Sequence, residues 1–311
     1  MSPKYSLLAL DIDGTLLPRS RTLSERTVQA LQRVASTGAT VALCTGRSAL
    51  STLSVETQLG FSVHCICCNG AVAIAPKPFI SEFQSVSDRK VLFLEPIPRE
   101  AVRAISETAS RLTATLQHHE HGHAAVRVRV HSSEQLQAME ARRQWLGDLE
   151  YIPMDDADHF DAFALPVKML MLSNDPVSHQ ALLRERVPGV TVYREATFVD
   201  CISARADKSV GVRRLCESLG MQVQQVVAFG DGWNDVEFLK EAGLGFAMAN
   251  AHPEIKAIAH RVTRYTNDEE GVAHEVEEML AQGLFGPPAG IPAIVNAEKR
   301  TMDILSQEPK L

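Results

Sequence analysis

Four apolar runs in this sequence each end on a polar side chain, and this repeated pattern limits the possible folds more than any other feature. The run at 7–10 ends on Asp11, and Asp13 follows two residues later. Comparable runs within 40–47, 63–71 and 224–232 lead to Thr45, Asn69 and Asp231. Continuous apolar runs of this length are typical of strands that are buried on both faces of a parallel sheet.

Helical patterns separate these strands. In 22–38, Val28, Leu31 and Val34 form an apolar stripe, while Thr22 and Glu25 have the spacing of a capping box. Strands that alternate with helices predict an α/β fold with a doubly wound, Rossmann-like parallel sheet. Ligands bind such sheets outside the carboxyl ends of the strands, so we expect the polar strand-end residues to meet in one crevice.

The pattern changes after about residue 80 and returns near residue 192. Between them, "AAVRVRV" at 124–130 alternates strictly, which predicts an antiparallel strand with one face in water. We therefore expect a discontinuous core domain, 1–84 and 192–284, and an inserted α+β cap domain, 85–191. The remaining tail, 285–311, begins with a Gly- and Pro-rich linker, and we expect it to be poorly ordered.

Composition narrows the classes of function. The net charge of −7 does not favour nucleic acid or an anionic membrane as a partner. No apolar run approaches the roughly 18 residues of a membrane span, and the apolar run at 7–10 is too short for a signal peptide. The cysteines of "CICC" at 65–68 lack a second pair at zinc-site spacing, so we interpret them as buried thiols. These features predict a cytoplasmic protein.

The three aspartates expected in the crevice, Asp11, Asp13 and Asp231, need a cation. Oxygen ligands suit a hard ion, and Mg²⁺ is the usual one where phosphate is also bound. The alternative is that Asp11 and Asp13 only begin a turn, since "DG" is a common turn pair. The polar residues at the other strand ends favour the metal site over the turn.

Two further segments carry candidate residues. Asp207 is a plausible N-cap, which puts Lys208 in the first turn of a helix, where a cation opposes the helix dipole. A solvated surface lysine is the alternative. In "GDGWNDVEFL", Asn234 and Asp235 lie at a helix start, where either one can be an N-cap while the other contacts metal or phosphate.

Together, "DIDGT", "CTGR", Lys208 and "GDGWND" resemble the four ordered motifs of the haloacid dehalogenase-like (HAD) phosphatases. The insert between the second and third motifs resembles the large α/β cap of the Cof-like branch. The resemblance covers roughly residues 5–282, weakly over the cap. The four motifs in order and at this spacing form a strong signal, although each alone is weak.

The resemblance implies a role for each motif residue. Asp11 is the nucleophile that forms an aspartyl-phosphate, and Asp13 is the general acid and base. Phosphate contacts are implied for Thr45, Gly46, Lys208 and Asn234. Mg²⁺ is held by Asp11, Asp231 and, through its backbone carbonyl, Asp13, with Asp235 or Asn234 helping directly or through water. Arg47 and Asn69 lie at the substrate edge of the crevice.

The cap contains a His-rich stretch, "QHHEHGHAAVRVRV". A metal site and a solvated hairpin tip are both possible interpretations, but a loop that faces the substrate is the better functional hypothesis. The candidates there are His121, His123 and Arg127.

These features predict a Mg²⁺-dependent phosphatase that acts on a small phosphorylated metabolite, with a sugar phosphate favoured over pyridoxal phosphate or flavin mononucleotide. A phosphomutase uses the same aspartyl chemistry. A catalytically inactive, metal-binding regulatory protein is the non-enzymatic alternative, although the intact set of motif residues opposes it. The sequence leaves monomer and homodimer both open.

Overall fold

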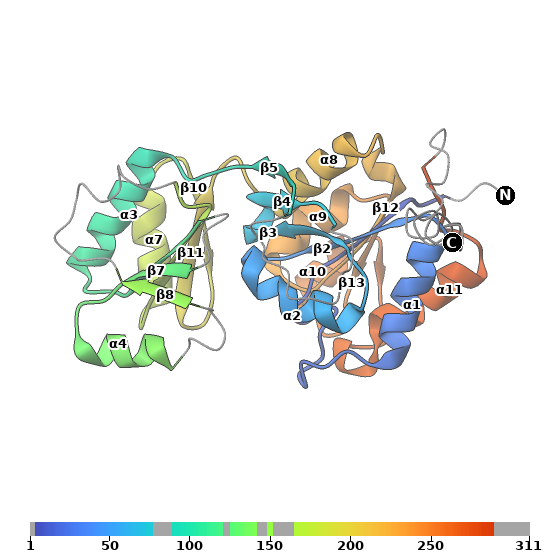
Figure 1. Ribbon diagram of the computed structural model, residues 1–311, viewed down its shortest axis with the longest axis horizontal. Helices are drawn as coiled ribbons and strands as arrows, with labels where there is room; N and C mark the ends of the chain where they lie inside the picture. The colour runs from blue at the N-terminus through green and yellow to red at the C-terminus, as the bar shows by residue number, and fades with distance from the viewer. Residues whose placement is uncertain (1–3, 77–88, 121–124, 142–147, 152–164, 289–311) are drawn as a thin grey trace, which may run out of the picture.

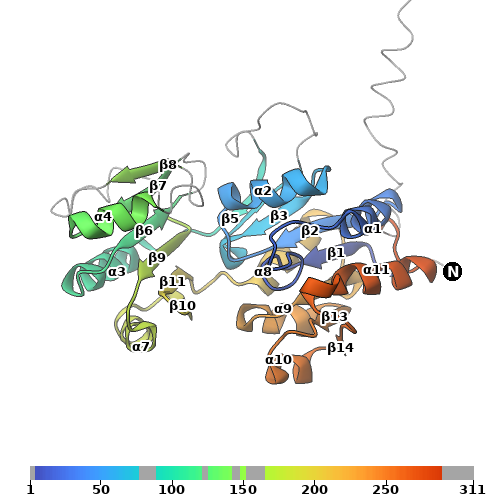
Figure 2. The ribbon, with the colours of Figure 1, turned by 90° about the horizontal axis from the view of Figure 1, so that it is seen from below.

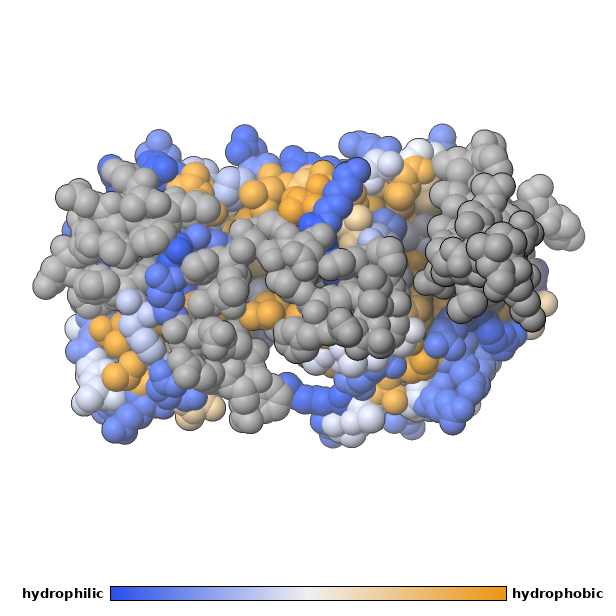
Figure 3. All heavy atoms as spheres, in the orientation of Figure 1, coloured by the Kyte–Doolittle hydropathy of each residue, from blue (hydrophilic) through white to orange (hydrophobic). Residues whose placement is uncertain are grey.

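The computed structural model describes residues 4–76, 89–120, 125–141, 148–151 and 165–288. Two parts lie side by side, each built around its own sheet (Figure 1). Where the face in Figure 3 is coloured, hydrophobic residues lie among hydrophilic ones. None of the described helices is both long enough and apolar enough to cross a membrane.

The larger part contains an eight-stranded sheet in the order β14-β13-β12-β1-β2-β3-β4-β5. The strands from β14 to β3 are parallel, and β4 and β5 continue the sheet in antiparallel pairing. The predicted α/β fold is therefore confirmed. In chain order the strands are β1 (Leu7–Leu10), β2 (Thr40–Cys44), β3 (His64–Cys67), β4 (Val72–Ile74), β5 (Val91–Leu94), β12 (Val226–Gly230), β13 (Leu244–Ala247) and β14 (Arg261–Val262).

Helices cover both faces of this sheet, which explains why its central strands are apolar throughout (Figure 2). One face packs against α1 (Glu25–Ser36), α2 (Ala49–Leu59) and α11 (Gly271–Ala281). The other packs against α8 (Lys208–Ser218), α9 (Val236–Glu241) and α10 (Pro253–Ile258). Short 3-10 turns complete this part: η1 (Cys68–Gly70), η3 (Val223–Gln225), η4 (Trp233–Asp235) and η5 (Asn267–Glu269).

The smaller part contains a six-stranded sheet in the order β10-β11-β9-β6-β7-β8. Its strands are β6 (Leu116–His119), β7 (Ala125–Arg129), β8 (Asp148–Tyr151), β9 (Lys168–Leu172), β10 (Val190–Arg194) and β11 (Phe198–Ser203). All neighbours are antiparallel except β7 and β8. On one face, α3 (Arg99–Arg111) and α7 (Pro176–Arg186) cover an apolar core, while α4 (Ser133–Glu140) packs against β7.

The sheet pairings bear on where the two domains divide. β5 belongs to the eight-stranded sheet, although it follows the expected boundary at residue 85. β10 and β11 belong to the six-stranded sheet, although most of their residues follow the expected boundary at 191. Because strands of one sheet share its core, we propose that the cap begins after β5 and ends after β11.

The end of the described chain packs against its beginning. Phe285 is buried and bridges to Tyr5, and the Gly286 N–H donates to the Tyr5 carbonyl. The first residues of the expected tail, 285–311, therefore belong to the core, and the residues from 289 onward lie outside the described part of the chain.

Two local expectations were wrong. Helix α1 is capped by Ser24, whose hydroxyl accepts from the Thr27 N–H, and not by a capping box at Thr22. In β7, the arginines of the alternating pattern are not in water, because Arg127 is buried and forms ion pairs with Glu120 and Glu150. Arginines that are paired with carboxylates can lie on a buried face of a sheet. The alternating pattern alone therefore did not show which face is exposed to solvent.

Candidate active site

The predicted crevice is present at the carboxyl edge of the core sheet. Four adjacent strands, β12, β1, β2 and β3, run parallel. Asp231 follows β12, Asp11 follows β1, Thr45 follows β2, and Asn69 follows β3. Because the strands are parallel, their carboxyl ends meet at one edge and bring these distant residues together.

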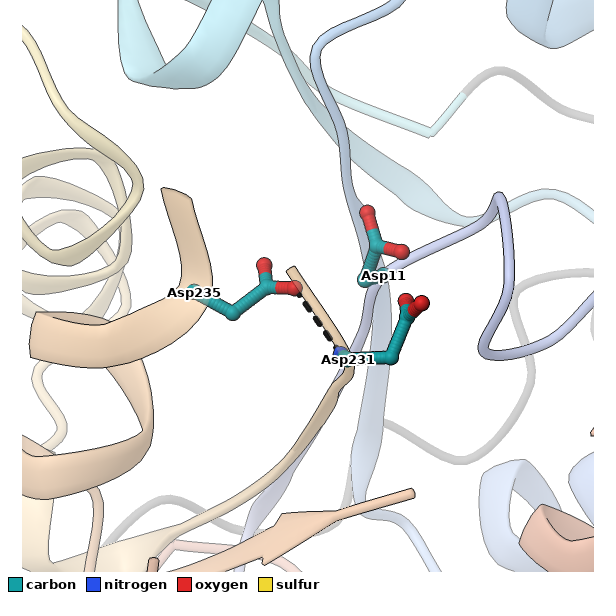
Figure 4. Close-up of side chains that lie close together, drawn as sticks. All are labelled: Asp11, Asp231 and Asp235. Carbon is teal, nitrogen blue, oxygen red and sulfur yellow. Dashed lines mark hydrogen bonds between the residues drawn. The ribbon is translucent and has the colours of Figure 1, made fainter. Parts of the chain in front are cut away.

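Three carboxylates form the centre of this edge. Asp11, Asp231 and Asp235 each offer an oxygen, and the three oxygens lie within 4.8 Å of one another. They come from the end of β1, the end of β12 and the start of α9, and their carboxyl groups converge (Figure 4). No other such cluster of His, Cys, Asp or Glu occurs among the described residues.

Burial and mutual repulsion disfavour the charged state of this cluster. Burial raises the pKa of Asp11 well above its usual value, and the charges of Asp235 and Asp231 raise it further. Burial, with repulsion from Asp235, raises the pKa of Asp231 to about 6. Three close oxygen donors, two of them with raised pKa values, fit a hard divalent cation such as Mg²⁺, because its charge would offset both effects.

Lys208 is completely buried beside this cluster. Its Nζ lies 2.6 Å from Asp11 Oδ1 and 2.5 Å from Asp235 Oδ1. The predicted N-cap is confirmed, since Asp207 Oδ1 accepts from the Val210 N–H at 2.8 Å. Burial opposes the ammonium charge, but Asp11 and Asp235 outweigh it and raise the pKa of Lys208. The alternative of a solvated surface lysine is wrong.

Asp235 is fixed by the loop in front of it. Its Oδ2 accepts from the backbone N–H groups of Asp231 and Gly232, at 3.0 and 2.9 Å. The side chain of Asn234 contacts Asn69 and not the acidic cluster, since its Nδ2 donates to Asn69 Oδ1 at 2.8 Å. This bond joins the loop after β12 to the loop after β3. Of the two helix-start residues, Asp235 is therefore the one in the acidic cluster.

Two residues of the "DIDGT" motif that we had not singled out support Asp231. The Thr15 hydroxyl donates to Asp231 Oδ1 at 2.8 Å. Gly14 adopts a left-handed conformation with φ of 81°, and a Cβ there would collide with the Asp231 carboxylate. Both residues directly follow Asp13 in the sequence, so their place in the motif could have marked them as candidates.

Asp13 lies apart from the three clustered carboxylates. Its side chain is 59% exposed and forms a two-pronged ion pair with Arg47, at 2.6 and 2.7 Å. Arg47 was expected only at the substrate edge, and the structure places it directly beside Asp13. This separation leaves the Asp13 carboxylate accessible from the crevice while the Asp11 carboxylate is buried.

The loop after β2 is held on two sides. The Asn69 N–H donates to the Thr45 carbonyl at 2.9 Å, and the Arg47 N–H donates to Thr45 Oγ1 at 3.1 Å. From the cap, Lys168 Nζ donates to the Gly46 carbonyl at 3.1 Å and pairs with Asp200 Oδ2 at 2.6 Å.

Sequence reasoning missed this cap pair. Lys168 begins the otherwise apolar strand β9, and Asp200 is the only charged residue of β11. A lone charge within an apolar strand was the available signal, because buried charges in proteins are normally paired.

Of the three substrate candidates that the sequence predicted in the cap, the structure describes one, Arg127. His121 and His123 lie outside the described residues. Arg127 pairs in register with His118 on β6, and His118 in turn faces Met169, which belongs to the core under α3 and α7. Alternation along β9 puts Lys168 on the other face. The structure therefore does not bring Arg127 to the crevice.

The six cysteines are free and buried, which confirms the prediction made for those of "CICC" at 65–68. Burial raises the pKa of Cys68 to about 12, which keeps it as an inert thiol. None of these cysteines contributes to the acidic cluster.

Comparison with known proteins adds independent observations. The model of a family described as haloacid dehalogenase-like hydrolases matches residues 8–276. A putative phosphatase of Haemophilus influenzae is 28% identical over 283 residues, which cover 89% of this chain and 99% of that protein. The 5-amino-6-(5-phospho-D-ribitylamino)uracil phosphatase of Bacillus subtilis is 27% identical, with 90% and 100% covered.

Solved structures agree with this match. A haloacid dehalogenase-like hydrolase from Bacteroides thetaiotaomicron gives a TM-score of 0.72 at 27% identity, with 89% of this chain and 100% of that chain covered. One from Bacillus subtilis gives 0.73 at 25% identity, with 88% and 99% covered.

Proposed function

The chain belongs to the family of haloacid dehalogenase-like hydrolases, and on that premise we propose that it is a Mg²⁺-dependent phosphatase of a small phosphorylated metabolite. The observation that carries the proposal is the buried Lys208 held between Asp11 and Asp235, with Asp231 completing the acidic cluster. The relatives named as phosphatases support it.

In the proposed reaction, an oxygen of Asp11 attacks the phosphorus of the substrate and forms an aspartyl-phosphate. The bond from phosphorus to the leaving oxygen breaks, and Asp13 gives its proton to the departing alcohol. Asp13 then takes a proton from water, which attacks the phosphorus. The second step releases phosphate and restores the Asp11 carboxylate, so a difficult hydrolysis is divided into two easier steps.

The positions of the two aspartates fit these roles. Asp11 is buried against Lys208, whose ammonium can neutralise the nucleophile and the incoming phosphoryl group. Asp13 is exposed at the crevice beside Arg47, where an alcohol and a water molecule can reach it. Thr45, Gly46 and Asn234 surround the crevice as proposed phosphate contacts.

Asp11, Asp231 and Asp235 would hold the cation, together with the Asp13 backbone carbonyl. When bound, Mg²⁺ supplies positive charge that offsets the repulsion between these carboxylates and the phosphate. Phosphoryl transfer depends mainly on such charge neutralisation and on positioning, which are the two things that these residues provide.

We favour a sugar phosphate as the substrate, with pyridoxal phosphate or flavin mononucleotide as the next candidates. The B. subtilis relative, by its name, acts on a phosphorylated ribityl compound, which supports a polyhydroxylated leaving group. A phosphomutase would use the same Asp11 chemistry but would return an isomerised phosphate ester, whereas a phosphatase releases free phosphate. A screen of phosphorylated metabolites for released phosphate distinguishes them.

The proposal is tested by hydrolysis of p-nitrophenyl phosphate with Mg²⁺. The wild-type protein should release nitrophenol, and Asp11→Asn should reduce the rate to background. Asp175→Asn is a matched control, because the exposed Asp175 caps α7 and asparagine caps helices equally well. If Asp11→Asn still turned over at the wild-type rate, the proposal would be wrong. Binding of Mg²⁺ by a wild-type protein without hydrolysis would instead support the regulatory alternative.

A further inference from the structure

The peptide unit between Gly46 and Arg47 is held at both ends. Its carbonyl oxygen, on Gly46, accepts from Lys168 Nζ at 3.1 Å. Its N–H, on Arg47, donates to Thr45 Oγ1 at 3.1 Å. Because a peptide unit is planar and rigid, a hydrogen bond that fixes its carbonyl also fixes the direction of its N–H. Lys168 therefore acts on the environment of the Thr45 hydroxyl without touching it.

The N–H of this peptide determines the hydrogen-bonding role of the Thr45 hydroxyl. A hydroxyl has one proton to donate and accepts through its oxygen. Since Thr45 Oγ1 already accepts from the Arg47 N–H, its own proton is left to donate to another acceptor. A phosphoryl oxygen in the crevice is such an acceptor. If the peptide rotated, the hydroxyl oxygen would lose this donor and its fixed orientation.

Lys168 is held rigidly by the cap. It begins β9 and pairs with Asp200 of β11 at 2.6 Å, and both side chains are about nine-tenths buried. Burial opposes the ammonium charge, but Asp200 outweighs it and raises the pKa of Lys168. The pair carries no net charge, so its influence on a phosphate in the crevice comes mainly from the hydrogen bond to Gly46.

We propose that Lys168 is a positioning residue, which orients the Thr45 hydroxyl for phosphate through the Gly46–Arg47 peptide. This inference rests on the proposed function, because it takes Thr45 as a phosphate contact. It makes phosphate affinity depend on a cap residue that lies 122 positions away from the loop it contacts. By thermodynamic reciprocity, bound phosphate strengthens the contact between the cap and this loop by the same factor.

The test is a double-mutant cycle read in the affinity for inorganic phosphate, measured by titration calorimetry with Mg²⁺. One variant is Thr45→Val. The other is the paired change Lys168→Met/Asp200→Leu, which removes two buried charges together and leaves neither unpaired. The combined variant completes the cycle. Thermal unfolding shows that each variant is folded, and Lys168→Leu/Asp200→Asn replaces the paired change if that variant unfolds.

We expect Thr45→Val to weaken phosphate binding by about tenfold, the size of one hydrogen bond to a charged group. The paired change should weaken it by roughly fivefold in the wild-type background and by less than about twofold in the Thr45→Val background. An exposed pair provides the matched control, and Lys240→Met/Glu237→Leu should leave the affinity unchanged.

Two results would overturn the inference. The paired change could leave phosphate affinity at the wild-type value, or its effect could be equally large with and without the Thr45 hydroxyl. Both results are distinguishable from failure of the proposed function, in which the wild-type protein binds phosphate but hydrolyses no phosphate ester. A wild-type protein that binds no phosphate would overturn both.

Discussion

Lys208 and Asp11 are separated by 197 positions in the sequence, and yet Lys208 Nζ lies 2.6 Å from Asp11 Oδ1. The lysine side chain is fully buried, and Asp235 accepts from the same ammonium group at 2.5 Å. This contact joins the start of α8 to the end of β1. It explains how the core accommodates carboxylates that would otherwise repel one another.

We expect Lys208→Met to lower the free energy of unfolding by about 3–5 kcal/mol at neutral pH without Mg²⁺, because it leaves two buried carboxylates without their cation. Chemical denaturation measures this loss. Lys240→Met, which removes an exposed lysine, should change it by less than about 0.5 kcal/mol. A loss below about 1 kcal/mol for Lys208→Met would show that the buried ion pair contributes little.

Mg²⁺ should raise the melting temperature of the wild-type protein. A ligand that binds only the folded state stabilises it by about 2.7 kcal/mol at a concentration one hundred times its dissociation constant. Asp231→Asn removes one carboxylate of the cluster and should abolish most of this shift. An equal shift in the variant would place the cation elsewhere.

The affinity for Mg²⁺ should depend on pH. Burial, with repulsion from Asp235, raises the pKa of Asp231 to about 6, so protons compete with the cation below that value. We expect the dissociation constant measured by calorimetry to be constant above pH 7 and to increase by up to about tenfold per pH unit below 6. A constant affinity between pH 5 and 7 would contradict the raised pKa.

The cap should lose stability in mild acid. Burial lowers the pKa of His119 from 6.5 to about 3, so the unfolded chain takes up this proton before the folded chain does. The stability that this histidine contributes is present above pH 6.5 and is lost as the pH falls toward 3, with about 2 kcal/mol lost at pH 5. His119→Gln should reduce the difference in unfolding free energy between pH 7 and pH 5 by this amount. An unchanged difference would show that His119 does not titrate in this way.

Asp11 and Asp13 should be separable by mutation. Asp13 is exposed and lies outside the clustered carboxylates, and its backbone carbonyl survives any side-chain change. We therefore expect Asp13→Asn to retain Mg²⁺ affinity within about threefold while it slows hydrolysis by at least about a hundredfold. Asp11→Asn should weaken both. Loss of Mg²⁺ binding in Asp13→Asn would place its side chain among the metal ligands.

Much of this arrangement follows from sequence patterns. The apolar runs that end at Asp11, Thr45, Asn69 and Asp231 predicted a parallel sheet, and that prediction is confirmed. Burial on both faces of a central strand leaves an unbroken apolar run, and the first polar residue marks the strand end. The family resemblance is confirmed as well.

The features that could not be predicted from the sequence are contacts between distant segments of the chain. The Lys168–Asp200 pair joins β9 to β11, and its contact with Gly46 joins the cap to the core. Neither spacing nor periodicity encodes such a contact. The prediction for Arg127 failed for a related reason. Its partners Glu120 and Glu150 both lie outside β7, so the pattern of that strand alone does not show them.

The central claim is that Asp11 is the nucleophile, and an intermediate trapped on it tests this most directly. Nitrophenol leaves without help from an acid, whereas hydrolysis of the aspartyl-phosphate needs Asp13 as a base. Asp13→Asn mixed with p-nitrophenyl phosphate and Mg²⁺ and then quenched in acid should therefore accumulate one phosphoryl group per chain, and peptide mass spectrometry should locate it on Asp11. A phosphoryl group on another residue, or none in a variant that still releases nitrophenol, would contradict the account.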